Sequence, residues 1–352
     1  METTTYKLKD VLKIGNGKDH SSLPDGEYPV LGSGGIMRYA NRYLYDGESV
    51  LLPRKGTLNN IQYIKGKFWT VDTCYYTIIN QDITHPYYLY RLLRTFDLSG
   101  LDSGASIPSM TSKTYYGIKV QLPPLPTQQK IASILSAYDN LIQNYKKQIE
   151  ALQAAASELY KEWFVRFRFP GWQTAKFENG IPEGWSIEKL TELVEIKYGK
   201  DHSKLDDGNI PVYGSGGIMR YCNKALYDKE TVLIPRKGSL NNIMYANNPL
   251  WTVDTMFYTV MLRKNIAKYL YYVLSKIDME SFNAGAALPS MTTEILSHFK
   301  IIVPDNEILE SFDKKIALIF TQIDNLQQQI TNLTQQRDLL LPRLMSGKLE
   351  VE

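Results

Sequence analysis

Apolar residues recur in alternating steps of four and three along two long segments of the chain. This spacing amounts to a repeat of 3.5 residues, which is typical of helices that pack along a coiled-coil seam. A proline-containing stretch precedes each segment, LPPLPTQQK in the first and IVPDNEILE in the second. We expect two helices of about 35–40 residues, each about 55 Å long at 1.5 Å per residue. The seam positions are Tyr138, Ile142, Tyr145, Ile149, Leu152, Ala156, Leu159 and Trp163, then Phe312, Ile316, Ile319, Ile323, Leu326, Ile330 and Leu333, continuing through Arg337 to Leu340.

Short apolar runs interrupted by Gly, Pro or Asn precede each long segment. Runs such as 49–52 and 71–79 are rich in Val, Ile and Tyr, which favours strands. Residues 86–96 and 265–278 have the spacing of amphipathic helices. The pattern therefore predicts globular parts of the mixed α+β class.

The sequence of the globular part occurs twice in the chain. PVLGSGGIMRYANRYLYDGESVLLPRKGTLNN, from Pro29, matches PVYGSGGIMRYCNKALYDKETVLIPRKGSLNN, from Pro211. Roughly two thirds of positions 29–79 are identical to their counterparts about 180 residues later, a period that indicates a duplicated domain. We expect a first domain at 1–125, a first long helix at 126–166, a linker at 167–183, a second domain at 184–303, and a second long helix with a C-terminal tail at 304–352.

A long helix with an apolar seam needs a partner, and its duplicate is the nearest one. We therefore expect an antiparallel two-helix coiled coil that separates the two domains, related by a pseudo-two-fold axis. The alternative is two unrelated surface helices, each on its own core. That alternative explains less well why both seams keep their register over several heptads.

Composition narrows the class of protein. Net charge is only +3 with 22% charged residues, so any binding of a polyanion must use particular loops. The two cysteines, Cys74 and Cys222, are aligned with Met256 and Ala40, which indicates apolar surroundings and neither a disulfide nor a zinc site. With no signal peptide or membrane span in the sequence, we expect a cytoplasmic protein that does not bind membranes.

The repeated basic loops, PRKG at 53–56 and at 235–238, carry the candidate chemistry. Proline and glycine stiffen the turn, Arg presents a fork that matches guanine O6 and N7, and Lys suits a phosphate. An Asn amide can pair with adenine. The alternative is an exposed turn with solvated charges. The candidate DNA contacts are Lys18, His20, Ser33, Arg38, Arg54, Lys55, Thr57, Asn59 and Asn60, and their counterparts Lys200, His202, Ser215, Arg220, Arg236, Lys237, Ser239, Asn241 and Asn242.

Two neighbouring features have structural explanations that compete with binding. The GSGG runs at 32–35 and 214–217 could form an anion nest, but glycines packed beside a strand explain them better. Trp69 and Trp251 head apolar runs and are expected to pack in the core or at its rim, with stacking on nucleic acid as the alternative.

Catalytic signatures are missing from the sequence. It contains no HExxH, Gly-x-Ser-x-Gly or nucleotide-binding loop. A duplicated active site that pairs His20 with Asp19 and His202 with Asp201 is geometrically poor, because adjacent side chains in extended backbone point in opposite directions. We expect a binding protein with no catalytic residues, metal site or cofactor of its own.

The layout resembles the specificity subunit of type I restriction–modification systems. The resemblance covers the whole chain and depends on the tandem architecture, IPEGW at 181–185, LPPLPTQQKIASILSAYDNLI at the start of the first helix, and the tail LLLPRLMSGKLEVE. It implies two target-recognition domains that each read half of a bipartite site on double-stranded DNA. The helices would set the spacer between half-sites and dock two methyltransferase subunits.

The partners implied by this resemblance carry the chemistry. Methyltransferase subunits would bring S-adenosylmethionine and methylate adenine N6, and restriction subunits would add cleavage that depends on ATP and magnesium. Because the two domains are so alike, we expect a near-palindromic interrupted target. The alternative function is a coiled-coil adaptor that displays two protein-binding domains and does not read DNA.

Overall fold

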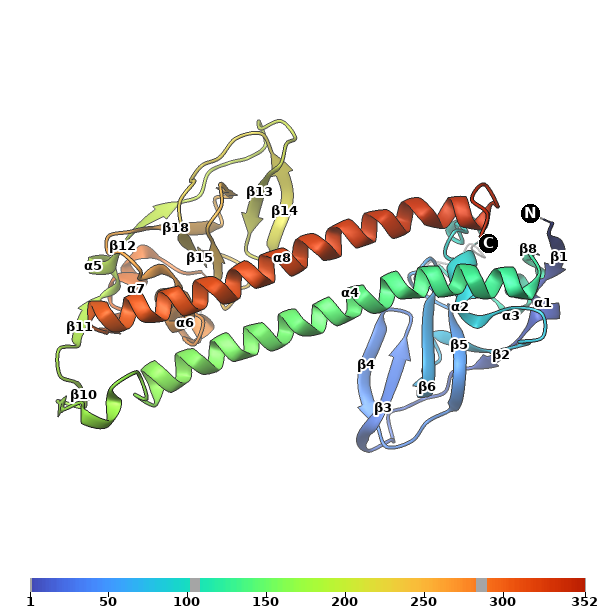
Figure 1. The fold of residues 1–352 in the computed structure, drawn as a ribbon, viewed down its shortest axis with the longest axis horizontal. Helices are drawn as coiled ribbons and strands as arrows, with labels where there is room; N and C mark the ends of the chain where they lie inside the picture. Colours follow the sequence, from blue (N-terminus) through green and yellow to red (C-terminus); the bar gives the residue numbers. More distant parts are fainter. Residues whose placement is uncertain (1, 102–107, 283–289, 352) are drawn as a thin grey trace. The chain divides into compact units, whose positions relative to one another are not determined.

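The computed structural model describes residues 2–101, 108–282 and 290–351. Contacts divide the chain into two units, unit 1 with Met1–Lys146 and Gln327–Glu352, and unit 2 with Lys147–Leu326. Each unit contains a mixed α/β domain together with portions of two long helices (Figure 1). The mixed α/β class is therefore confirmed, while the five-part division of the chain stays a prediction.

The domain of unit 1 is built on a six-stranded sheet in the order β2-β7-β5-β6-β3-β4. All neighbours are antiparallel except β3 and β6, which are parallel. A separate pair, β1 with β8, closes the domain beside the short helices α1 and α3. The bounds are β1 (Thr4–Lys7), α1 (Leu8–Val11), β2 (Leu12–Asn16), β3 (Asp25–Gly32), β4 (Gly35–Ala40), β5 (Tyr45–Pro53), β6 (Gln62–Thr70), β7 (Cys74–Ile79), α2 (Pro86–Leu93), α3 (Ser112–Gly117) and β8 (Lys119–Leu122).

The domain of unit 2 repeats this topology with one break. In place of the six-stranded sheet it has two, β12-β18-β15-β16 and β14-β13-β17, because the counterpart of β6 is split into β16 and β17; β11 with β19 and β9 with β10 form separate pairs. Pro249 lies in the split and has no N–H for a sheet hydrogen bond, which explains the break. The bounds are β9 (Phe177–Glu178), β10 (Ile181–Pro182), β11 (Ser186–Lys189), α5 (Leu190–Leu193), β12 (Val194–Tyr198), β13 (Ile210–Gly214), β14 (Gly217–Cys222), β15 (Thr231–Pro235), β16 (Met244–Ala246), β17 (Trp251–Thr252), β18 (Met256–Met261), α6 (Ala267–Leu274), α7 (Thr293–Ser297) and β19 (Lys300–Val303).

The expected short elements exist with different ends. The strand predicted at 49–52 lies inside the longer β5, and the one predicted at 71–79 begins only at Cys74, whose N–H closes a turn onto the carbonyl of Val71 at 3.0 Å. The helix predicted at 265–278 begins only at Ala267, because Asn265 has a φ of 61°, which no α-helix accommodates, and it ends at Leu274.

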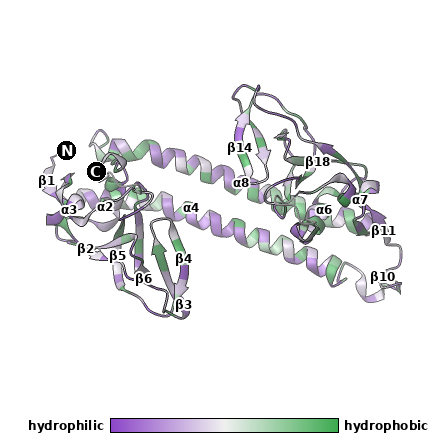
Figure 2. Cartoon of the chain, turned by 180° about the vertical axis from the view of Figure 1, so that it is seen from behind, coloured by the Kyte–Doolittle hydropathy of each residue, from purple (hydrophilic) through white to green (hydrophobic). Residues whose placement is uncertain are grey.

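The long helices are α4 (Leu125–Tyr160), with 36 residues, and α8 (Asn306–Met345), with 40. A π-helical turn, Lys161–Val165, follows α4. Both expected lengths are confirmed, and the described seam side chains are buried or half-buried. Hydrophobic and hydrophilic residues alternate along both helices (Figure 2). None of the helices in the described part of the chain is long and apolar enough to cross a membrane.

A buried glutamine fixes the start of α4 in unit 1. Gln128 is fully buried, and its amide oxygen accepts hydrogen bonds from the Thr84 hydroxyl at 2.9 Å and the His85 N–H at 3.0 Å. Its amide nitrogen donates to the carbonyls of Ile83 and Pro123 at 3.0 and 2.9 Å. Because every polar group of the side chain is satisfied, its burial locks the helix to the segment before α2.

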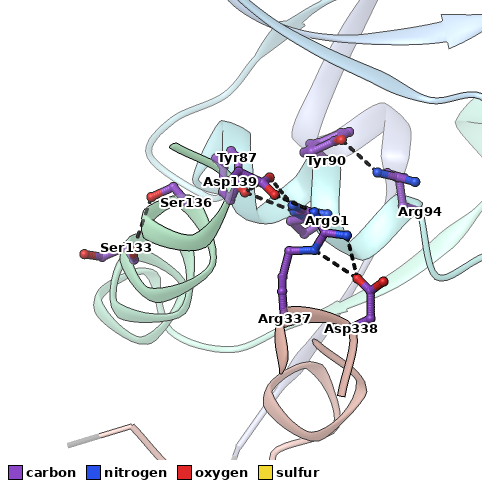
Figure 3. Close-up of polar contacts among 9 residues, drawn as sticks. All are labelled: Tyr87, Tyr90, Arg91, Arg94, Ser133, Ser136, Asp139, Arg337 and Asp338. Atoms are coloured by element: carbon purple, nitrogen blue, oxygen red, sulfur yellow. Dashed lines mark hydrogen bonds and ion pairs between the residues drawn. The ribbon is translucent and has the colours of Figure 1, made fainter. Parts of the chain in front are cut away.

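A charged network holds the C-terminal part of α8 in unit 1 (Figure 3). Asp139 of α4 binds Arg91 of α2 and Arg337 of α8, the latter at 2.7 Å, and also accepts a hydrogen bond from Tyr87. Arg91 is 2% exposed, so this charge depends on its carboxylate partner. Burial alone would raise the pKa of Asp139, but the bonds from Tyr87 and Arg337 and the charge of Arg91 hold its pKa below the ordinary value.

The corresponding place in unit 2 is aromatic. The residues aligned with Arg91, Asp139 and Arg337 are Tyr272, Phe320 and Ala156, and the rings of Tyr272 and Phe320 lie 6.4 Å apart. Ala156 of α4 is fully buried in the same core. The two units thus hold their helix ends by different interactions.

Candidate nucleic-acid interface

The first basic loop follows β5 and is fixed by backbone hydrogen bonds. The N–H groups of Arg54 and Lys55 both donate to the carbonyl of Thr73, at 2.8 and 3.3 Å. Gly56 adopts a φ of 89°, a left-handed conformation that favours glycine, and Leu58 anchors the loop in the core at 4% exposure. The backbone therefore holds its two cationic side chains in a defined place.

The second loop has the same scaffold. The N–H groups of Arg236 and Lys237 donate to the carbonyl of Thr255 at 2.8 and 3.3 Å, and Gly238 has a φ of 85°. The match extends from sequence to hydrogen-bond geometry, so both domains present the loop in the same local form.

Each loop is joined to the neighbouring GSGG turn. The Asn60 amide donates to the carbonyl of Ser33 at 2.6 Å, and the Asn242 amide donates to that of Ser215 at 2.8 Å. These candidate residues are therefore brought together, and Asn60 and Asn242 position the turn beside the basic loop.

The arginines of the two loops differ in their aromatic partners. Arg54 lies over the ring of Tyr75 at 5.9 Å, whereas Arg236 lies over that of Tyr198 at 5.3 Å. Each also donates to a nearby backbone carbonyl, at 3.4 and 3.3 Å. Both guanidinium groups are half-buried and oriented by the protein, as a base-reading fork requires.

The lysines remain exposed. Lys55 and Lys237 project from the loops, and Lys18 and Lys200 lie on segments whose backbone is fixed by a tryptophan. The indole N–H of Trp69 donates to the carbonyl of Lys18, and that of Trp251 to the carbonyl of Lys200, both at 2.9 Å. Trp69 is half-buried and Trp251 is buried, which confirms the expectation that they pack in the core or at its rim. Thr57 and Ser239, the remaining loop candidates, are also exposed.

Asn59 and Asn241 use their amides for folding. Asn59 donates to Asp97 at 3.1 Å and accepts from the Leu98 N–H at 2.8 Å, and Asn241 bonds Asp278 and the Met279 N–H in the same way. Each amide uses one N–H and one oxygen lone pair in these bonds. The two residues therefore anchor the loop, and their contact with DNA stays a prediction.

Arg38 and Arg220 also bind the protein itself. Arg38 donates to the carbonyl of Leu23 at 2.6 Å and to Asp25 at 3.0 Å, and Arg220 donates to the carbonyl of Leu205 at 2.6 Å. Both arginines fasten the segment that leads into the β3–β4 hairpin or its counterpart, β13–β14.

The histidines lie on these leading segments and are half-buried. Asp19 bonds the hydroxyl of Ser21 at 2.6 Å, and Asp201 bonds Ser203 likewise, so each carboxylate is engaged away from His20 or His202. This geometry gives no support to a catalytic His–Asp pair.

The explanation that the GSGG glycines are needed for packing is wrong for Gly34 and Gly35. A Cβ added to Gly34 or Gly35 would meet nothing within 4 Å, and Gly35 has a φ of 122°. Only Gly32 is close to a neighbour, the Met37 sulfur, at 2.9 Å from such a Cβ. Gly35 supplies the left-handed residue that the β3–β4 turn needs, and nothing in the structure explains Gly34.

The same hairpins expose a group of apolar residues that was not predicted from the sequence. Ile36, Met37 and Tyr39 of β4 are 56%, 59% and 50% exposed. Their counterparts on β14, Ile218, Met219 and Tyr221, are 49%, 61% and 51% exposed. The signal was present, because GSGGIMRY is identical in both copies.

Both cysteines are fully buried, as their apolar counterparts indicated. Burial raises the pKa of the Cys74 thiol to about 12, so it is not a nucleophile at neutral pH. Among the described residues, no group of three His, Cys, Asp or Glu side chains is placed to hold a metal ion.

Comparison with known proteins identifies the family. The model for the type I restriction modification DNA specificity domain matches residues 1–154 and 182–339. The chain is 25% identical to the type I restriction enzyme MjaIX specificity subunit of Methanocaldococcus jannaschii, covering 98% of this chain and 93% of that protein. It is 26% identical to the MjaVIII specificity subunit of the same organism, covering 77% and 71%.

A solved structure supports the fold. The S subunit of a type I restriction–modification system from M. genitalium superposes with a TM-score of 0.69 at 17% identity, covering 97% of this chain and 96% of that one. With the family model matching most of its length in two segments, the chain belongs to the family of type I restriction–modification DNA specificity proteins.

Proposed function

We propose that each of the two domains reads one half of a bipartite, near-palindromic target on double-stranded DNA. The observation that carries the proposal is the basic loop itself, which recurs in both domains with the same hydrogen bonds to Thr73 and to Thr255. Arg54 and Arg236 read bases, while Lys55 and Lys237 contact phosphates. The anchored residues Asn59, Asn60, Arg38 and their counterparts position these loops.

The long helices set the spacer between the half-sites. Within unit 1, the first part of α4 packs with the last part of α8, as the Asp139–Arg337 pair shows. Within unit 2, the π-helical turn that follows α4 packs with the start of α8, where the rings of Phe164 and Phe312 lie 4.8 Å apart. These contacts favour the antiparallel coiled coil and the pseudo-two-fold relation.

The chain works as a non-catalytic subunit. Two methyltransferase subunits dock on it and supply S-adenosylmethionine, and restriction subunits add the ATP- and magnesium-dependent cleavage. The buried Cys74 and the engaged Asp19 and Asp201 support the view that the reacting groups lie on the partners. An adaptor without DNA readout is not favoured, because it leaves the two matched basic loops unexplained.

Methylation mapping tests the proposed target. In cells that carry this gene and its methyltransferase partner, we expect N6-methyladenine in a bipartite motif whose halves are similar and inverted. Similar readers related by a two-fold axis bind similar half-sites in opposite orientation. Single-molecule sequencing gives the motif and its spacer directly. Two unrelated halves would overturn the palindromic part, and no new motif would overturn DNA reading.

The salt dependence of binding tests the lysines. We expect replacement of Lys55 and Lys237 with alanine to weaken binding to all duplexes alike and to flatten the slope of log K against log salt by about two, because two phosphate contacts are lost. The measurement is fluorescence anisotropy with the assembled methyltransferase complex at several salt concentrations. Lys264→Ala, a lysine outside the two loops, is the control. An unchanged slope contradicts the assignment.

A further inference from the structure

The β3–β4 and β13–β14 hairpins each expose an isoleucine and a methionine just beyond a glycine turn. Strand β4 is at the edge of its sheet, as is β14. An exposed apolar edge strand promotes aggregation, so proteins usually protect it with charge, a bulge or a bound partner. These edges have a bulge beside the turn, but their apolar side chains remain in solvent.

The position of these side chains indicates what covers them. The turn before Ile36 is tied to the basic loop by the 2.6 Å bond from Asn60 to Ser33. A Cβ on Gly56 of the loop would lie 3.2 Å from the Ser33 hydroxyl, so the loop lies against the side chain of the turn. The apolar pair therefore lies near the cations proposed to contact phosphates, which points to a polyanion with apolar groups between its charges.

Duplex DNA has this pattern in its major groove. The groove is about 12 Å wide and admits a two-stranded β-ribbon, and its apolar feature is the 5-methyl group of thymine. Methionine adapts its shape readily to such a surface. Nothing in the duplicated loops explains why a protein partner would contact cations and apolar side chains in this order on both domains.

We propose that Ile36 and Met37, and likewise Ile218 and Met219, contact thymine methyl groups in the major groove of the target. The β3–β4 and β13–β14 hairpins enter the groove at the two half-sites, while Lys55 and Lys237 of the basic loops bind the flanking backbone. This inference rests on the proposed DNA-reading function and adds thymine-specific apolar contacts to it.

The experiment removes only the methyl group. Duplexes carrying the mapped target are prepared with deoxyuridine in place of each thymine in turn, and affinity is measured with the assembled complex. For wild-type protein we expect about a fourfold loss at the contacted thymine of each half-site, the value of burying one CH₂ group. The Ile36→Ser/Met37→Ser variant should bind the thymine and uracil duplexes equally at its own half-site and keep the wild-type response at the other.

The corresponding variant of the second domain, Ile218→Ser/Met219→Ser, should bind the thymine and uracil duplexes equally at the second half-site and keep the wild-type response at the first. Ile78→Ser, which removes a 43% exposed isoleucine from β7, should retain both methyl responses. A wild-type complex indifferent to every uracil, a half-site without thymine, or variants that keep the wild-type response would each overturn the inference. A wild-type complex that binds all sequences alike would instead overturn the proposed function. Because the uracil series on wild-type protein needs no variant, folding defects cannot obscure the outcome.

Discussion

The Asp139→Ala variant is expected to lose about 3–5 kcal/mol of unfolding free energy, because it leaves the buried Arg91 without a carboxylate and Arg337 with only the exposed Asp338. Arg91 is 2% exposed and the side chain of Arg337 is 16% exposed, so water cannot replace the lost partner well. For a unit of this size, the loss corresponds to a fall in Tm of roughly 6–20 °C. Calorimetry or urea unfolding of the full chain in its complex measures it.

Two control variants distinguish the effect of an unpaired buried arginine from a nonspecific loss of stability. Asp338→Ala removes the other partner of Arg337, but the side chain of Asp338 is 56% exposed, so we expect a loss below about 1 kcal/mol. Combining Asp139→Phe, Arg91→Tyr and Arg337→Ala replaces the three charged residues with those aligned with them in unit 2 and should recover most of the stability, because removing a whole buried ion network is often neutral. A loss below about 1 kcal/mol in Asp139→Ala would refute the role of the network.

The same network predicts a pH dependence. The pKa of Asp139 is lower in the folded protein than in the unfolded chain, so its stabilising contribution is complete above about pH 4 and is lost as pH falls through the folded value. The stability difference between wild type and Asp139→Ala should therefore shrink in acid. A difference that stays constant down to pH 2 would contradict this.

The second large effect concerns base reading. We expect Arg54→Ala to weaken binding by about 1–3 kcal/mol and to relax base preference at one position of the first half-site only, because a guanidinium fork is lost. Arg236→Ala should do the same in the second half-site. The measurement is the affinity of the assembled complex for duplexes with single base changes, at one fixed salt concentration.

Arg54→Lys is the matched variant, since it keeps the charge and removes the fork. It should restore general affinity without restoring base preference. Equal losses on every sequence after Arg54→Ala would place this residue among the phosphate contacts. The different ring partners, Tyr75 and Tyr198, further predict that the two arginines need not read their bases with equal stringency.

The parts of the fold that depend on periodicity could be predicted. The sequence reveals both the heptad pattern of α4 and α8 and the duplication, because each involves many residues at regular spacing. The ends of short elements depend on single residues, such as Asn265 with its positive φ or Pro249 with its missing N–H, and patterns average over such residues.

The sequence indicated which residues make up the candidate site, but only part of what each residue does. The basic loops and their glycines were identified from the repeat, but the sequence does not reveal that the amide of Asn59 is occupied by Asp97. Likewise, Arg337 and Asp139 are 198 positions apart, and no local pattern links them. Such roles follow from tertiary contacts between residues that the chain keeps distant.

The polar network of unit 1 and the aromatic cluster of unit 2 also bear on how a duplicated gene diverges. Two identical halves would accept each other's helix ends freely, and chains could exchange them and polymerise. Here a transplanted Arg337 would arrive among rings where the nearby carboxylates of Glu230 and Asp313 already bind Lys268, while Ala156 would leave Asp139 with one cation fewer. Each pair of helix ends therefore matches the residues of its own unit, and the two halves are no longer interchangeable.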